Sequence, residues 1–478
     1  MKKMNESSTL NVKLNVKPIL FTMYHLNAYM GPCRYGEGYA LTTEADMESG
    51  QREFEIFKNE LATEVDLSNV NMLEPAVVVW NEDFALRESE MQKAVADDAN
   101  TDFYLVRGLR ISSYFAVELA KRTNKPIGHT PNKSAISKCD HVDMTAHLYA
   151  INHEAYGFLD FEEMNQTFET LRLKKALRKT KIFFPLKSSM LTFGCQSSYI
   201  NLDEITKKFG VQFAHVNSED VFKWLDALTD EEKKEAVAIA DQLVADSKGV
   251  HMPSKYIVND VEYYLTIKKM MKHYDCNAFT MPCFEVCATK ELDKRKLTFC
   301  LAHSLLKDEG IASACAGDVG SVISISILMN IAKRAPYMGN TMVLDKNTNQ
   351  CRTLHDVASA QMKGYDAPAL PTEFVSFTMD NWGTTMRYDF AKDEGEALTL
   401  VNISPDMKKI MVAKGTINGC DDYLTPECKH AVRYTVADAK KFHECQKHVG
   451  HHFALVYGDY TEKVAAFARE CGMEVLEA

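Results

Sequence analysis

Short apolar segments of strand length alternate with longer helix-like segments over the first two thirds of this chain, and this alternation limits the folds open to it. The apolar segments include KPILFT (17–22), PAVVVW (75–80), DFYLVRG (102–108), KIFFPL (181–186) and VQFAHV (211–216). Helix-like stretches such as ESGQREFEIFKNELATEV lie between them. Strands that alternate with helices are typical of parallel sheets covered by helices on both faces. We therefore expect two parallel-sheet α/β domains.

Two helix ends carry clear local signals. LTDEEKKEAVAIADQLVADSKG (228–249) begins with Thr229 and Glu232, the spacing of a capping box, and we expect Gly249 to end this helix. LTFCLAHSLLKDEG should end at Gly310 in the same way. IASACAGD then predicts a short strand, followed by the almost wholly apolar helix VGSVISISILMNI.

The pattern changes beyond AKRAPYMGN (332–340). From there to about residue 436, EALTLVNI, KKIMVAKGTI and HAVRYTV are short alternating segments separated by turns, which indicates antiparallel β structure in a barrel or a sandwich. The final segment, from HHFALVYGD onward, returns to strand, helix and strand. The expected order is an N-terminal α/β domain (1–150), a central α/β domain (151–335) and a mostly antiparallel β domain (336–478).

Charge and cysteine usage exclude several classes of protein. The net charge of −11 argues against a nucleic-acid-binding surface. The first 21 residues lack the apolar core of a signal peptide, and no run of about 18 apolar residues predicts a membrane span. The 13 cysteines are odd in number and follow no secretion signal, so we expect reduced thiols and a cytoplasmic protein.

Asp318 is the first candidate site residue, and two interpretations of it stay open. Aspartate is a favoured N-cap, and its carboxylate can accept a backbone N–H two or three residues on. Asp318 also follows a predicted strand and precedes a helix, which is where open α/β sheets bind ligands. The small residues Ala316, Gly317 and Gly320 leave room for a ligand to approach.

Glu285 and the pair His451–His452 are the other candidates. Glu285 lies in AFTMPCFEVC (278–287), which begins as a strand, and a buried carboxylate there needs a cation, a metal or hydrogen bonds. An edge-strand glutamate that faces solvent is the alternative. Adjacent histidines on a strand point to opposite faces, so one of the pair can face a site. Carboxylates and an imidazole from separate elements suit a divalent cation such as Mn²⁺.

Four cysteines and one glycine-containing segment suggest other kinds of site. Cys283, Cys287, Cys300 and Cys315 suggest a zinc or iron–sulfur site, although the C-x3-C spacing departs from the usual C-x2-C. Cys300 falls on an amphipathic helix, where a buried structural thiol is the ordinary explanation. GPCRYGEGYA (31–40) lacks the G-x-G-x-x-G pattern of a phosphate loop, and we expect a loop that touches substrate through Arg34 or Glu37.

Three segments together resemble the L-fucose isomerase-like family. LAHSLLKDEGIASACAGDVGSVISISILMNIAKRAPYMGN is similar to the family's helix, D-E-G-I, small-residue strand, G-D and long apolar helix. CFEVC is similar to its strand that bears a metal-binding glutamate, and HHFALVYGD to its C-terminal pattern. The resemblance covers about residues 275–345 and 430–478, and the chain is identified as a divergent member.

The resemblance implies an aldose–ketose isomerase acting on a small sugar or deoxysugar, with three domains and a trimeric or hexameric homo-oligomer. It implies a divalent metal, usually Mn²⁺, held by Glu285, Asp318 and His452, with the two carboxylates as acid–base groups. Such enzymes move a proton between C1 and C2 through an ene-diol, whose oxyanion the metal stabilises. No nucleic-acid or membrane partner is implied.

The chain departs from the family pattern at two places. Ala316 stands where relatives commonly have a glutamate, and Asp380 and Asn381 stand in a segment (374–389) where relatives tend to carry a histidine. Asp380 is a substitute oxygen ligand in one interpretation. The alternative is therefore a family member that binds or transforms a carbohydrate without isomerising it, and a cysteine-based metal or redox protein is the third hypothesis.

Overall fold

The computed structural model describes residues 4–24, 43–81, 87–108, 112–131, 139–186, 202–422 and 428–478. The chain divides into two compact units. One contains Lys13–Arg172, and the other contains Met1–Val12 together with Leu173–Ala478. The division into three domains (1–150, 151–335 and 336–478) stays a prediction.

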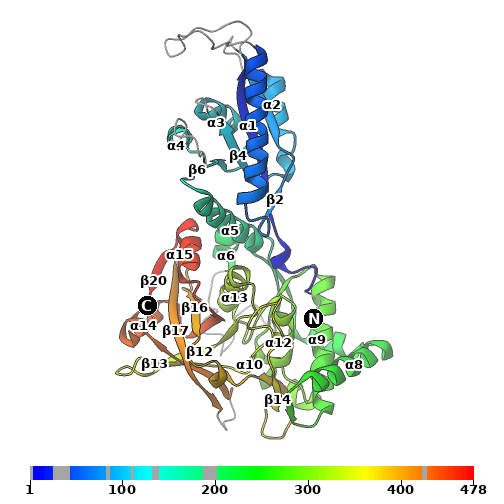
Figure 1. Cartoon of the computed structure of the whole chain (residues 1–478). Helices are drawn as coiled ribbons and strands as arrows, with labels where there is room; N and C mark the ends of the chain where they lie inside the picture. The colour runs from blue at the N-terminus through cyan, green and yellow to red at the C-terminus, as the bar shows by residue number, and fades with distance from the viewer. Residues whose placement is uncertain are drawn as a thin grey trace. The chain divides into compact units, whose positions relative to one another are not determined.

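The Lys13–Arg172 unit is a parallel sheet with helices on both faces (Figure 1). Its central strand β1 pairs with β2, β3 and β4, and the sheet continues to β5 and β6. Apolar side chains of α2, α3 and α4 pack on one face, and those of α1 and α5 pack on the other. The elements are β1 (Leu14–Tyr24), α1 (Thr43–Glu64), β2 (Val70–Met72), β3 (Ala76–Asn81), α2 (Glu88–Val95), β4 (Phe103–Gly108), α3 (Ser112–Ala120), β5 (Ile127–His129), α4 (Asp140–Ala150), β6 (Ala155–Gly157) and α5 (Phe161–Arg178).

A second parallel sheet, in the order β11-β10-β7-β8, lies in the larger unit. Its inner strand β10 and its edge strand β11 have three buried residues each, whereas the other edge strand, β8, is partly exposed. The elements are β7 (Lys181–Leu186), α6 (Leu202–Phe209), β8 (Gln212–Asn217), α7 (Ser218–Asp226), α8 (Asp230–Asp246), α9 (Lys255–His273), β10 (Ala278–Thr280), α10 (Cys283–Ala288), α11 (Glu291–Arg295), α12 (Cys300–Asp308), β11 (Ala312–Ala314) and α13 (Val319–Ala332).

The C-terminal third forms a closed antiparallel barrel. The strands follow the order β16-β19-β12-β13-β18-β17, and pairing of β16 with β17 closes the ring. A small separate sheet contains β15, β14 and β9. The elements are β9 (Gly249–His251), β12 (Tyr337–Asp345), β13 (Gln350–Leu354), β14 (Glu373–Ser376), β15 (Thr384–Arg387), β16 (Ala397–Ile403), β17 (Lys409–Asp422), β18 (His430–Val436), α14 (Ala439–Val449), β19 (His452–Tyr457), α15 (Thr461–Glu470) and β20 (Glu474–Glu477), the last of which runs parallel to β17.

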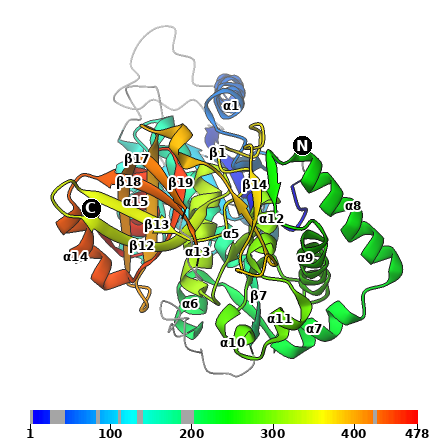
Figure 2. The ribbon, with the colours of Figure 1, turned by 90° about the horizontal axis from the view of Figure 1, so that it is seen from below.

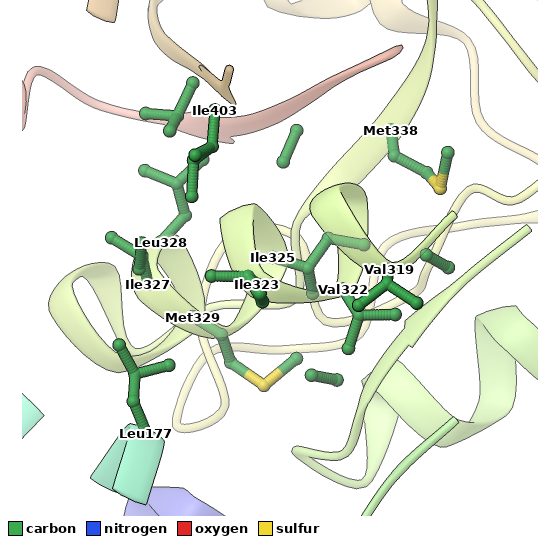
Figure 3. Packing of buried hydrophobic residues seen from close by; sticks show 14 of the residues in the cluster. Leu177, Val319, Val322, Ile323, Ile325, Ile327, Leu328, Met329, Met338 and Ile403 are labelled. Carbon is green, nitrogen blue, oxygen red and sulfur yellow. The ribbon is translucent and has the colours of Figure 1, made fainter. Parts of the chain in front are cut away.

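Helix α13 joins the parallel sheet to the barrel. Every residue from Val319 to Ala332 is buried, because β10 and β11 of the parallel sheet and β16 and β19 of the barrel all contact the helix. Figure 2 shows α13 with the barrel strands beside it. Figure 3 shows Ile325 and Leu328 of α13 among the apolar side chains of this cluster, with Met338 and Ile403 from the barrel strands. A helix that is apolar all round is thus explained by burial on all sides.

The predicted fold class is confirmed: parallel-sheet α/β structure is followed by an antiparallel β domain. The capping box of Thr229 and Glu232 is present, and Gly310 follows α12 with a left-handed φ of 75°. The prediction for Gly249 is wrong, because α8 ends at Asp246 and Gly249 begins β9. Ser247 already has an extended backbone, so the chain leaves the helix before the glycine. Within the described ranges, no helix is both long enough and apolar enough to cross a bilayer.

Candidate functional site

Asp318 lies at the turn between β11 and α13. Two successive residues with left-handed backbone, Ala316 (φ 62°) and Gly317 (φ 71°), reverse the chain and place Asp318 at the N-cap of α13. Its Oδ1 accepts the backbone N–H of Ser321 at 3.0 Å. The capping interpretation of Asp318 is therefore correct, but it accounts for one carboxylate oxygen only.

The second oxygen of Asp318 meets His452, the first residue of β19. Oδ2 of Asp318 lies 2.7 Å from Nδ1 of His452. Asp318 is 0% exposed and His452 is 4% exposed. His452 is held from behind by strand pairing with Asn340 of β12. The fold thus brings a carboxylate and an imidazole, 134 residues apart in the sequence, into a buried pair.

This pair has a defined chemistry. A carboxylate that faces Nδ1 favours a proton on that nitrogen, so the pair fixes the tautomer and the orientation of the ring. The other ring nitrogen, Nε2, then carries the lone pair, which is the form that an acceptor, a base or a metal ligand requires. An orienting carboxylate behind a histidine is found both in general-base catalysis and at metal centres.

Two more histidines, His355 and His451, lie beside the pair. His451 is one of the candidates predicted from the sequence, but His355 is not. The ring of His355 lies 5.9 Å from that of His452, and the ring of His451 lies 4.5 Å from it. His355 is buried, and its Nδ1 accepts the backbone N–H of Asp356 at 3.2 Å. The Sγ of Cys428 lies 3.5 Å from the same nitrogen. Strand β12 pairs with both β13 and β19, and this strand order, which no local pattern predicts, brings the end of β13 near His452.

Burial controls the charge of these rings. Desolvation, together with the neighbouring His452, holds the pKa of His355 well below its ordinary value. Desolvation and His452 also lower the pKa of His451, and the carboxylate of Asp318 opposes this effect. His355 and His451 are therefore neutral donors and acceptors near neutral pH.

Glu285 does not lie on a strand, and that prediction is corrected. Strand β10 ends at Thr280, and Glu285 falls in the short helix α10, whose N-cap is Pro282. Proline presets the backbone for a helix start, which the apolar CFEVC pattern concealed. Because β10 and β11 are adjacent and parallel, α10 and Asp318 both follow carboxyl ends at one edge of the sheet. The side chain of Glu285 lies outside the described residues.

The remaining predicted positions are less central. Asp380 and Asn381 are exposed residues of the turn between β14 and β15. Arg34 and Glu37 lie outside the described residues. Among the four candidate cysteines, Cys300 and Cys315 are buried, Cys283 is half-buried and Cys287 is exposed.

The donor types of the pair suit a metal site. Carboxylate oxygen and imidazole nitrogen are donor types that Mn²⁺ accepts, although Nδ1 of His452 is taken up by its 2.7 Å contact with Asp318 Oδ2, so His452 would bind an ion through Nε2. Among the described side chains, no three of His, Cys, Asp or Glu gather as a complete ligand set for a metal. The four candidate cysteines therefore form no such set among these side chains. The predicted third ligand, Glu285, is not among these side chains.

Fold and site together define an α/β protein with an attached antiparallel barrel and a buried carboxylate–imidazole pair at their junction. No known family model matches the chain. The chain is similar to the proteins named sulfoquinovose isomerase of Priestia aryabhattai and Priestia megaterium. Each is 24% identical over 325 residues, which cover 66% of this chain and 68% of the relative.

A third protein of that name, from Alkalicoccus urumqiensis, is 24% identical over 190 residues, which cover 37% of this chain and 40% of the relative. These similarities bear out the resemblance to the L-fucose isomerase-like family, and their 24% identity fits a divergent member.

Proposed function

We propose that this chain is an aldose–ketose isomerase that acts on a small sugar through an ene-diol, with Asp318, His452 and Glu285 as its site residues. The observation that carries the proposal is the buried pair of Asp318 and His452, at the carboxyl edge of a parallel sheet, in a chain similar to three sugar isomerases. Sulfoquinovose, the substrate in the names of those relatives, is the first sugar to test.

Residues of this chain supply the proton chemistry in the proposal. Isomerisation removes a proton from one carbon of the sugar and returns it to the neighbouring carbon. Asp318 and Glu285 are the proposed acid–base groups, and Asp318 also holds the ring of His452 through Nδ1. The surroundings of Asp318 exclude water, which strengthens every electrostatic contact with the developing oxyanion.

A divalent ion of the Mn²⁺ class belongs to the same proposal. Glu285, Asp318 and His452 would hold it, since carboxylate oxygens and imidazole nitrogen suit that ion. When bound, such an ion polarises the sugar's carbonyl and hydroxyl oxygens. The homo-oligomer and the cytoplasmic location expected from the sequence also remain part of the proposal.

The test is isomerisation in D₂O, followed by proton NMR. We expect the purified chain to convert sulfoquinovose or another aldose to its ketose and to exchange the C2 proton with solvent, which is the signature of an ene-diol. Asp318→Asn should lower turnover by about 10²–10⁴-fold, the usual contribution of a general acid–base group. Full turnover in Asp318→Asn would refute the assignment of this residue.

One observation favours a second candidate function. Ala316 stands where relatives commonly carry a glutamate, which leaves one carboxylate fewer beside Asp318. A chain that binds sugars tightly but neither isomerises them nor exchanges their C2 proton, at any Mn²⁺ concentration, would be a carbohydrate-binding or carbohydrate-transforming relative instead. Ala316→Glu is the companion variant for that outcome.

A further inference from the structure

A basic pocket lies in the larger unit, at the C-terminal ends of three helices. It has a volume of about 270 Å³ and is lined by Lys174, Arg178, Lys208, Phe209, Glu470 and Cys471. Three of these six residues are cationic and one is anionic, so the lining carries a net charge of about +2. The helices that supply the cations are α5 and α6, and α15 supplies Glu470.

Internal contacts satisfy part of this charge. Lys174 forms an ion pair with Glu470 at 3.0 Å, with about a quarter of each side chain exposed. Lys208 donates to the carbonyl of Gly472 at 3.3 Å. The guanidinium of Arg178, in contrast, forms no hydrogen bond or ion pair with any described residue. The pocket therefore keeps a guanidinium that no described acidic side chain pairs with, next to a partly engaged lysine.

Helix C-termini offer an ordinary explanation that covers only part of this arrangement. Cations in a last turn interact favourably with the helix dipole, which suits Arg178 and Lys208. The dipole does not require cations of different helices to face one hollow. Gly210, with φ 74°, lets the chain after α6 pass close to Arg178, because a Cβ there would lie 2.7 Å from the Arg178 Cγ. A glycine at this point keeps the two cationic helix ends together.

We propose that this pocket binds a small multivalent oxyanion of the phosphate class, with Arg178 and Lys208 as its main contacts. Guanidinium groups bind tetrahedral oxyanions through two parallel hydrogen bonds, and a lysine adds a point charge. Phosphate and small phosphate esters fit the volume of the pocket. The site is separate from the Asp318–His452 pair and does not depend on the proposed isomerase function.

Cys471 provides a built-in reporter of occupancy. It is a free, partly buried thiol in the pocket wall. Burial raises the pKa of Cys471 to about 11, so it reacts slowly with alkylating agents. The positive charges of Lys174 and Lys208 act in the opposite direction and lower this pKa. An anion in the pocket covers the thiol and neutralises the lysines, and both effects slow the reaction further.

The experiment uses inorganic pyrophosphate as the probe and the full-length chain. Iodoacetamide labelling of Cys471 is followed by mass spectrometry at constant ionic strength, and pyrophosphate binding is measured by calorimetry. We expect saturating pyrophosphate to slow labelling of Cys471 about 10-fold, and Arg178→Gln or Lys208→Gln to weaken binding by about 5–10-fold each, as for loss of one charged hydrogen bond. Labelling of the exposed Cys139 should not change.

Lys207→Gln is the matched control. Lys207 precedes Lys208 on α6 and carries the same charge, but it pairs with Glu204 at 2.8 Å and does not line the pocket. Equal weakening in Lys207→Gln and Lys208→Gln would show non-specific attraction and overturn the proposal. Unchanged labelling of Cys471 at millimolar pyrophosphate would overturn it as well. Neither result affects the isomerase test, because none of these residues belongs to the Asp318 site.

Discussion

Asp318 divides its two carboxylate oxygens between a helix and a histidine: Oδ1 caps α13 through Ser321, and Oδ2 binds Nδ1 of His452 at 2.7 Å. One side chain thus serves the fold and the candidate site at once. Substitutions at this position can separate the two roles, because asparagine and alanine remove different parts of the arrangement.

Asp318→Asn should keep the cap and lose the charge. Asparagine caps helices as well as aspartate does, but its amide cannot replace the carboxylate oxygen at Nδ1 of His452, so we expect a loss of about 1–2 kcal/mol in the free energy of unfolding. Asp318→Ala also removes the cap and leaves buried donors unpaired, at a cost of about 2–4 kcal/mol in total. Urea unfolding measures both. Equal stability of the two variants would mean that the cap contributes nothing measurable.

Mn²⁺ should bind to the chelator-treated chain at about one ion per chain if Glu285, Asp318 and His452 hold it. Calorimetric titration and elemental analysis measure this stoichiometry. In His452→Asn and Glu285→Gln we expect affinity to fall by at least about 10-fold, while Asp380→Asn, an exposed turn variant, should bind as wild type does. A chain that takes up no divalent ion would contradict the predicted ligand set.

Asp260 should make stability depend on pH. The buried carboxyl of Asp260 accepts the backbone N–H groups of Thr298 and Thr384, each at 2.6 Å, and burial raises its pKa from 3.8 to about 7. Between these two pH values the folded chain keeps a proton that the unfolded chain has released, so this group's contribution to stability falls as pH rises.

Asp260→Asn removes that dependence. We expect the variant to lose about 1–3 kcal/mol because its amide cannot accept from both backbone donors. The difference in stability between wild type and variant should shrink as pH rises from about 4 to about 7. Urea unfolding at several pH values measures it, and a constant difference would show that Asp260 has an ordinary pKa.

Lys307 should have the opposite effect at higher pH. Its buried Nζ donates to the carbonyls of Pro336 and Val357, and desolvation lowers its pKa from 10.5 to about 7. Between these values the unfolded chain holds a proton that the folded chain has released, so stability rises with pH. The free energy of unfolding of wild type, measured with urea, should therefore rise relative to that of Lys307→Met between about pH 7 and pH 10.

Local signals account for the parts of the fold that the sequence predicted. The run KIFFPL coincides with β7 and HAVRYTV with β18, and Thr229 with Glu232 forms the expected capping box. These features depend on neighbours within a few residues. Helix α10 was missed because six residues are too few to show a helical period and Pro282 begins it without a side-chain cap.

The candidate site was predictable only in part. Asp318 and His452 were found through motifs, and their contact confirms that the two segments meet. His355 was not found, because an isolated histidine after a short strand has no distinguishing pattern. Its place beside His452 follows from how β12 lies between β13 and β19 in the barrel, which is a property of tertiary strand order.

The separation of Asp318 and His452 along the chain also bears on how the protein folds. Closing a loop of 134 residues costs chain entropy before the contact stabilises anything, and β19 must insert between β16 and β12 for it to form. During refolding, helical circular dichroism should therefore recover before the site does. The pair would then be a late product of folding, and a chain that has only collapsed would have its helices but not the Asp318–His452 contact.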